Sequence, residues 1–270
     1  MSLKRLVLRS PLSSIAVDAR ERIALLGAAY RRSEELGMTS NDQLASTLVA
    51  RLGPADAVFV DVGAHLGTVV EAVLRRGDRR RVVAIEAVAE KAAFLRKRFP
   101  SIEVHHCAAG ECECEVSFFV DVRRSAYSSL GRPLPGREVH EVHVAMRPLD
   151  AVLQDERVGM IKIDVEGAEL GVLRGARRLI EAHRPVIMFE SGPLAEDGLG
   201  YSKEALYAWL DDAGYDIVVP NRVAHAGTPL SCDGFLESHQ HPRRTTNYFA
   251  IPREQRVLVR DRARAVLGFD

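Results

Sequence analysis

Acidic side chains close four short apolar runs of this chain. Each run holds about five residues rich in Val, Ile, Met and Phe, the pattern expected of a buried strand. The acids at their ends are Asp61, Glu86, Asp164 and Glu190. Carboxylates accept hydrogen bonds and can take up protons. Because ligands of an open parallel sheet bind beyond the carboxyl ends of its strands, these acids are predicted to face one crevice.

The first run and the loop after it read VFVDVGAHLG, residues 58–67. Gly63 suits a tight turn, and Gly67 suits the close approach of backbone or ligand. A dinucleotide site would favour G-x-G-x-x-G, whose middle glycine admits a pyrophosphate. Here that glycine is missing, His65 lies in the crowded region, and the Asp61 carboxylate would repel a diphosphate. The loop therefore favours a ligand with a cationic or hydrogen-bond-donating group.

Glu86 ends the second run, 19 residues after Gly67. A carboxylate at this place can accept two hydrogen bonds from a ribose diol. A ribose and an amino acid without phosphate describe S-adenosylmethionine. The alternative that Asp61 and Glu86 only cap their strands stays open.

Short apolar segments alternate with helical segments through most of the chain. The alternation predicts βαβ units and an α/β fold built on a parallel sheet. The predicted strands are 57–62, 81–86, 102–107, 114–120, 141–146, 160–165, 185–190, 215–220 and 245–251. The predicted helices between them are 67–76, 88–98, 167–182 and 202–213. Residues 221–244 have few periodic apolar positions and are predicted to form a long loop.

The same pattern divides the chain into three parts. Residues 1–56 are predicted to be an N-terminal helical extension, in which residues 39–42 cap a helix over residues 42–52. Residues 57–252 form the predicted core, and residues 253–270 a C-terminal helix. The N-terminal helices are also the predicted contact of a homodimer.

Composition limits the expected partners. Lys plus Arg equals Asp plus Glu at 37 each among 270 residues, whereas a nucleic-acid-binding protein favours a basic excess. No apolar run reaches the ~20 residues needed to span a bilayer, and the N-terminus shows no signal peptide. We therefore expect a cytoplasmic protein with no nucleic-acid or membrane partner and with reduced thiols. A zinc site is not expected, because the cysteines do not follow C-x-x-C spacing.

Seven motifs occur in an order that resembles one enzyme family. They are VFVDVGAHLG, VVAIEA, YSSL (127–130), RPLDAVL (147–153), IKIDVEGAELGVLRGA (161–176), PVIMFE (185–190) and TNYFAIP (246–252). The set resembles the FkbM-type S-adenosylmethionine-dependent methyltransferases over residues 57–252, and IKIDVEGAE is its most specific element. The resemblance implies the class I methyltransferase fold, a Rossmann-like sheet of seven mostly parallel strands with helices on both faces. It also implies S-adenosylmethionine as cofactor and O-methylation of a small-molecule hydroxyl, on a natural product or a sugar.

The resemblance assigns roles to residues as well. It implies a cofactor site made of Asp61, Gly63, His65, Gly67, Glu86, Ala87, Cys107, Ala108 and Asp164. The family usually has a Pro-Asp or similar pair after the ribose acid, where this chain has Ala87-Val88. We expect the acceptor to contact Tyr127, Ser128, Ser129 and His225.

Transfer of a methyl group to a hydroxyl requires loss of the hydroxyl proton, and a base within reach assists this step. Asp164 and Glu190 are the predicted catalytic residues, with Asp164 the stronger candidate. One alternative is a magnesium ion that bridges both carboxylates and a substrate diol; another is His65 as the base. Two other functions also stay open, an NAD(P)-dependent oxidoreductase and a nucleotide-binding module without catalysis.

Overall fold

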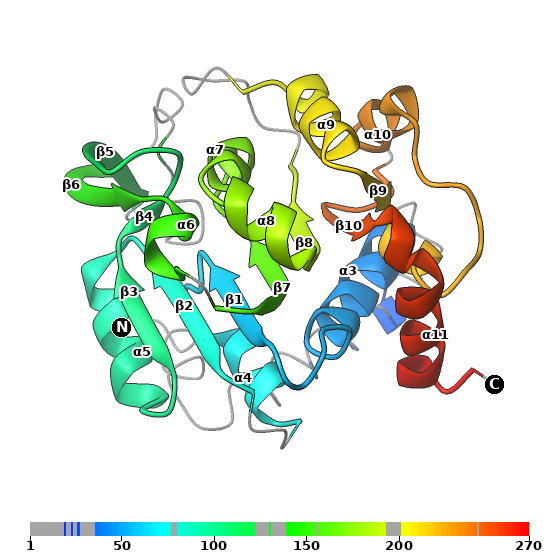
Figure 1. Ribbon diagram of the computed structural model, residues 1–270, viewed down its shortest axis with the longest axis horizontal. Helices are drawn as coiled ribbons and strands as arrows, with labels where there is room; N and C mark the ends of the chain where they lie inside the picture. The colour runs from blue at the N-terminus through cyan, green and yellow to red at the C-terminus, as the bar shows by residue number, and fades with distance from the viewer. Residues whose placement is uncertain are drawn as a thin grey trace.

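The computed structural model describes residues 36–76, 80–121, 130, 139–154, 156–192, 201–241 and 243–269, with residues 19, 23, 26 and 27. At its centre is a seven-stranded sheet in the order β3-β2-β1-β7-β8-β10-β9 (Figure 1). The strands are β1 (Val58–Val62), β2 (Val82–Glu86), β3 (Glu103–His106), β7 (Val158–Ile163), β8 (Val186–Glu190), β9 (Tyr215–Val218) and β10 (Asn247–Pro252). The first five strands in this order run parallel to one another, and β10 is antiparallel to both β8 and β9.

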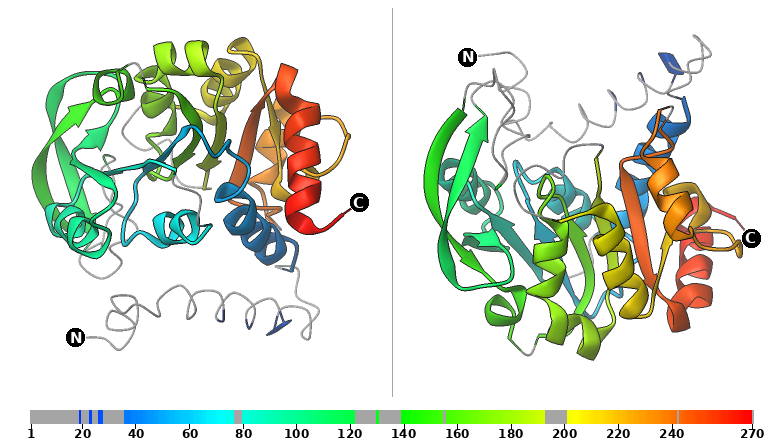
Figure 2. Two further views of the ribbon diagram at one scale, coloured as in Figure 1. Left: turned by 60° about the horizontal axis from the view of Figure 1, so that its bottom comes forward. Right: turned by 90° about the horizontal axis from the view of Figure 1, so that it is seen from above.

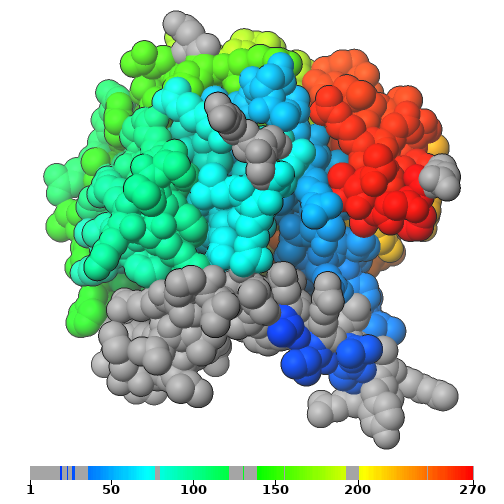
Figure 3. All heavy atoms as spheres, turned by 90° about the horizontal axis from the view of Figure 1, so that it is seen from below, coloured from blue at the N-terminus to red at the C-terminus, as the bar shows by residue number. Residues whose placement is uncertain are grey.

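Helices cover both faces of this sheet, because the strand residues alternate between two buried cores. Val58, Val60 and Val62 face one core and Phe59 faces the other. The first core is covered by α6 (Leu149–Val152), α7 (Glu169–Arg174), α8 (Arg177–His183), α9 (Lys203–Asp212) and α10 (Cys232–Ser238). The second is covered by α3 (Leu36–Val49), α4 (Thr68–Leu74), α5 (Ala89–Arg98) and α11 (Arg256–Leu267). The two layers are seen in Figure 2, and the outer surface of the second in Figure 3, with α11 in red. The predicted α/β fold is confirmed.

A second, three-stranded sheet lies beside the first. Its order is β4 (Ala108–Ala109), β6 (Val139–Arg147) and β5 (Cys114–Asp121), with β5 and β6 antiparallel. The segments predicted as strands at 114–120 and 141–146 thus form a separate sheet. Phe118 of β5 and Val144 of β6 pack with Val88 and Ala108, so this sheet is joined to the end of β2.

The prediction of a long loop over residues 221–244 is wrong, because this segment contains the helix α10. Ser231 caps this helix by accepting a hydrogen bond from the Gly234 backbone N–H at 3.1 Å. Phe235 is fully buried and anchors the helix in the first core. Only one large aromatic residue within CDGFLES, together with a helical glycine, gave little periodic signal for a helix.

Two predicted helix boundaries also differ from the structure. α3 runs without a break through residues 39–42, and Ser40 Oγ donates to the Leu36 carbonyl at 2.8 Å instead of capping a new helix. The helix predicted over residues 167–182 is two helices, α7 and α8. The break lies at Gly175, where a Cβ would stand 1.9 Å from the Gly110 carbonyl oxygen.

The cysteines correct a further expectation. Cys112, just before β5, and Cys114, the first residue of β5, form a disulfide, whereas Cys107 and Cys232 are free thiols. Among the described helices, none combines the length and the apolar character needed to cross a bilayer.

Candidate functional site

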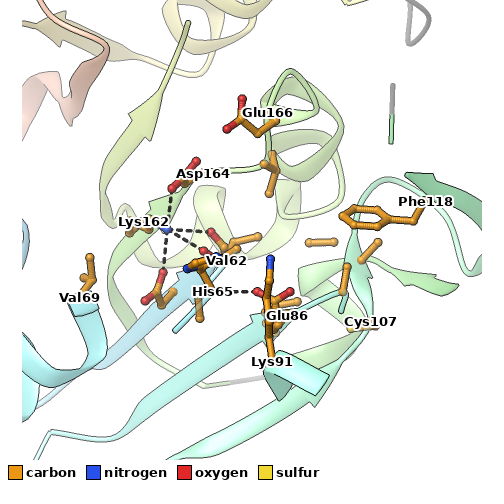
Figure 4. A pocket seen from close by; sticks show the side chains of 18 of the residues that line it. Val62, His65, Val69, Glu86, Lys91, Cys107, Phe118, Lys162, Asp164 and Glu166 are labelled. Atoms are coloured by element: carbon orange, nitrogen blue, oxygen red, sulfur yellow. Dashed lines mark hydrogen bonds and ion pairs between the residues drawn. The ribbon is translucent and has the colours of Figure 1, made fainter. Parts of the chain in front are cut away.

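A cavity opens at the carboxyl ends of β1, β2 and β7 (Figure 4). After β3 the chain crosses to the other side of β1 and forms β7, so the strand order reverses between β1 and β7. Parallel sheets bind ligands at such a reversal because the connections diverge there. The predicted site residues that line this cavity are Asp61, Gly63, His65, Glu86, Ala87, Cys107, Ala108 and Asp164.

Lys162 holds the two acids of β1 and β7 together. It is the register partner of Asp61, so the two side chains lie next to each other on one face of the sheet. The Lys162 ammonium lies 3.1 Å from Asp61 Oδ1 and 3.3 Å from Asp164 Oδ2, and it donates to the Gly63 carbonyl at 2.9 Å. Burial alone would lower the pKa of Lys162, but Asp61 and Asp164 raise it above its usual range. The ammonium therefore stays charged.

Asp61 is almost fully buried, at 1% exposure. Burial raises the pKa of its carboxyl, and Lys162 opposes that rise. Within the described residues neither Asp61 oxygen has a hydrogen bond of good geometry, so the ion pair with Lys162 balances its charge. Lys162 was not among the predicted site residues, although the register of two adjacent strand ends places it beside Asp61.

Glu86 faces the cavity from the end of β2. Its Oε2 accepts from the His65 backbone N–H at 2.8 Å, and its Oε1 accepts from the Val88 N–H at 2.9 Å. Burial raises the pKa of Glu86, and the nearby Lys91 ammonium opposes this most strongly. Lys91, which was not among the predicted site residues either, reaches the cavity from α5 (Figure 4). Each Glu86 oxygen still has a lone pair available to a ligand.

The two glycines of the first loop make room for protein rather than for ligand. Gly63 has a φ of +73°, and a Cβ there would lie 1.9 Å from the Asp164 carbonyl oxygen. Gly67 has a φ of +76° and lies against Phe99 of the segment after α5, with a Cβ 2.5 Å from its ring. The loop is thus closely packed, and it leaves no backbone cradle of the kind that a diphosphate needs.

His65 lies in the same loop with a positive φ of 50°. Burial, followed by the charge of Lys91, lowers its pKa to about 4. Its imidazole is therefore neutral near pH 7 and is a weak proton acceptor. This disfavours the alternative in which His65 is the base.

The other end of the cavity is apolar. It is formed by Cys107 and Ala108 from the end of β3 and the start of β4, with Phe118 and Leu130 opposite. Burial raises the pKa of the Cys107 thiol, which therefore stays protonated. Phe118 and Leu130 were not predicted, because their contact with the cavity depends on the pairing of the second sheet.

Asp164, just after β7, and Glu190, the last residue of β8, lie side by side. Their side chains are hydrogen bonded, and the pKa of Glu190 is raised to about 8, first by burial and then by the charges of Asp164 and Glu166. A carboxyl group next to another carboxylate is harder to ionise, because the two negative charges would repel each other. Near pH 7 the Glu190 carboxyl is therefore mainly protonated.

The remaining predicted residues lie elsewhere. His225 is exposed, follows the short helix η2 (Pro220–Arg222), and does not line the cavity. Tyr127, Ser128 and Ser129 lie outside the described residues. Within the part of the chain that the structure describes, no three His, Cys, Asp or Glu side chains are grouped to hold a metal ion.

A comparison of the sequence with protein families decides the family. The model of the methyltransferase FkbM domain matches residues 61–217, more than half of the chain. The chain belongs to the FkbM methyltransferase family. The resemblance drawn from its motifs is confirmed, and the seven-stranded sheet is the class I methyltransferase fold that the resemblance implied. An NAD(P)-dependent oxidoreductase is not favoured.

Individual relatives of this FkbM-family chain are distant. "Methyltransferase 1" of Beauveria bassiana is 26% identical over 147 residues, which cover 45% of this chain and 59% of that protein. The AMB antimetabolite synthetase AmbE of Pseudomonas aeruginosa is 27% identical over 216 residues, covering 65% of this chain and 10% of that protein. The chain thus spans about three fifths of the first relative and a tenth of the second.

Among solved structures, the FkbM methyltransferase of Methylobacillus flagellatus is similar with 21% identity and a TM-score of 0.45. The match covers 73% of this chain and 43% of that chain. The family assignment rests on the family model and not on this likeness.

Proposed function

We propose that this FkbM-family member is an S-adenosylmethionine-dependent O-methyltransferase that acts on a hydroxyl group of a small molecule, such as a natural product or a sugar. The observation that carries the proposal is one cavity lined by both Glu86, whose oxygens keep lone pairs for a ribose, and Asp164. Glu190 does not line the cavity itself and is joined to it through its hydrogen bond with Asp164. Family membership supports methyl transfer as the reaction.

The residues present fit this cofactor. Glu86 can accept the two ribose hydroxyls, and Cys107, Ala108 and Phe118 offer an apolar surface to an adenine ring. The filled spaces at Gly63 and Gly67 disfavour a diphosphate. When bound, the cofactor supplies a methyl group on a positively charged sulfur.

The acidic pair would act on the acceptor. The Asp164 carboxylate, held by Lys162 at 3.3 Å, is placed to take the hydroxyl proton, while protonated Glu190 donates a hydrogen bond to it. A positioned base contributes about 10²- to 10⁴-fold to such a rate. Correct alignment of the acceptor oxygen with the methyl group contributes more, up to about 7–11 kcal/mol of the barrier.

The test separates binding from chemistry. Asp164→Asn should bind S-adenosylhomocysteine within about threefold of the wild type by calorimetry, yet lose at least about 100-fold in methyl transfer to hydroxylated metabolites of the host. Asp212→Asn, at an exposed position on α9, is the matched control. Near-normal transfer by the Asp164 variant would contradict the role of Asp164. Binding of S-adenosylhomocysteine without transfer to any acceptor would instead favour a module without catalysis.

The predicted homodimer contact through the N-terminal helices falls mainly on residues outside the described part of the chain. It stays a prediction, which sedimentation of the full chain would test.

A further inference from the structure

A buried hydrogen-bonded cluster lies directly behind the end of β8. Ser191, the residue after Glu190, has its Oγ 2.8 Å from His239 Nε2, and His239 Nδ1 lies 2.8 Å from the Phe235 carbonyl oxygen. A carbonyl oxygen only accepts, so Nδ1 carries the hydrogen and Nε2 accepts from the Ser191 hydroxyl. The orientation of the ring is therefore fixed by a partner on each nitrogen.

Further contacts make this cluster rigid. Ser238 Oγ donates to the Phe235 carbonyl at 2.6 Å and lies 2.6 Å from the Tyr248 hydroxyl. The His239 ring stacks on Tyr248 with centroids 5.3 Å apart and meets Phe235 edge-on at 4.7 Å. All five side chains are buried. We call Ser191, Phe235, Ser238, His239 and Tyr248 the α10 clamp; a buried network whose members are hydrogen bonded has little freedom to rearrange.

The direction of the Glu190 side chain follows from its place at the end of β8, next to Ser191. Successive side chains of a strand face opposite sides of the sheet. Phe189 lies in the core beneath α10, and Met188 lies in the opposite core. Ser191 is therefore on the same face as Phe189, and Glu190 is on the same face as Met188. The Ser191 backbone N–H also donates to the Thr246 carbonyl at 2.8 Å. With Ser191 held by both its backbone and its hydroxyl, Glu190 is directed towards Asp164.

We propose that His239 is a positioning residue of the acceptor side, which acts through Ser191 to hold the Glu190 carboxyl against Asp164. The inference rests on the proposed function in treating this carboxyl pair as the acceptor side. This proposal assigns a role to α10, whose C-cap residue is His239 and which lies in the segment where the sequence pattern indicated only a loop.

Two substitutions of His239 separate positioning from packing. In His239→Gln the side-chain oxygen can reach the place of Nε2 and accept from Ser191. In His239→Asn the amide nitrogen can replace Nδ1 towards Phe235, but the Ser191 hydroxyl loses its acceptor. Ser191→Ala removes the same hydrogen bond from the other side with almost no change in volume.

The measurement is the titration of the Glu190 carboxyl, monitored by carbon-13 NMR. The Glu190 signal is identified as the one that is lost in Glu190→Gln. In the wild type and His239→Gln the midpoint should lie near pH 8. In His239→Asn and Ser191→Ala it should fall by at least about one pH unit, because a carboxyl that is no longer held in place becomes less buried and moves away from the charges of Asp164 and Glu166. Lys162 faces the same carboxyl and opposes the rise in every variant.

Equal midpoints in all four proteins would overturn the inference, as would a fall in His239→Gln as large as in His239→Asn. Circular dichroism at each pH shows whether each protein is folded. If the His239 variants unfold, the comparison of the Glu190 midpoint between Ser191→Ala and the wild type tests the proposal. Calorimetry with S-adenosylhomocysteine is a separate arm. A wild type that fails to bind it would count against the proposed function, while the NMR comparison would still decide the role of the clamp.

Discussion

Lys162 is the residue on which the acidic end of the cavity depends. Its ammonium is the cation between Asp61 and Asp164, and the Asp61 carboxylate is buried with no other described partner of good geometry. A buried charge is expensive unless it is paired, and removal of one partner of a buried pair leaves the other unbalanced. One side chain, that of Lys162, thus holds both Asp61 and the proposed base Asp164 in place.

Lys162→Met should therefore lower the free energy of unfolding by about 3–5 kcal/mol at pH 7. The loss should shrink as the pH falls, because Asp61, whose pKa is already raised by burial, is protonated more readily than an ordinary aspartate and then needs no partner. Urea unfolding at pH 7 and at a series of lower pH values measures the effect. Lys97→Met, at an exposed position of α5, is the control and should change little. A loss at pH 7 as small as that of the control would contradict this account of Asp61.

At the scale of elements, the sequence predicted the strand ends that matter most. β1, β2 and β8 end on or within one residue of their predicted ends, since each is an apolar run closed by an acid or a glycine turn. It could not predict α10, whose one large aromatic residue gives no periodicity. Nor could it predict that Phe118 reaches the cavity, because that depends on which strands pair. Local patterns indicate elements, and contacts between elements have no local signal.

Gly63, at the junction between β1 and the loop that follows it, is closely packed against the chain after β7. Gly63→Ala should destabilise the protein by at least about 2 kcal/mol, because φ is +73° and the new Cβ would overlap the Asp164 carbonyl. Gly227→Ala is the matched control: nothing lies within 4 Å of its Cβ, and its cost should stay within about 0.5 kcal/mol. Thermal unfolding compares the two, and equal costs would show that the close packing at Gly63 has no energetic weight.

For the whole molecule, buried acids with raised pKa values make stability depend on pH. Burial raises the pKa of Glu169, at the start of α7, to about 7. The folded state then binds more protons than the unfolded state between about pH 4.5 and 7, so stability is full below this window and falls as the pH rises through it.

Glu169→Gln removes this dependence and keeps an oxygen for the Gly167 N–H, which Glu169 Oε1 accepts at 3.0 Å. The variant should match the wild type near pH 4.5 and exceed it by up to about 3 kcal/mol at pH 8. Urea denaturation across this range measures the difference. A constant difference at every pH would refute the assignment of the titration to Glu169.

The place of β10 within the sheet has a consequence for synthesis. β10 follows β8 and β9 along the chain yet is inserted between them, so Glu190 meets its register partner Asn247 only after 57 further residues have been made. At ribosomal speeds this takes roughly 3–11 s. Throughout that time the β8 edge is an open template for another strand, and a nascent chain needs protection there until its own closing strand arrives.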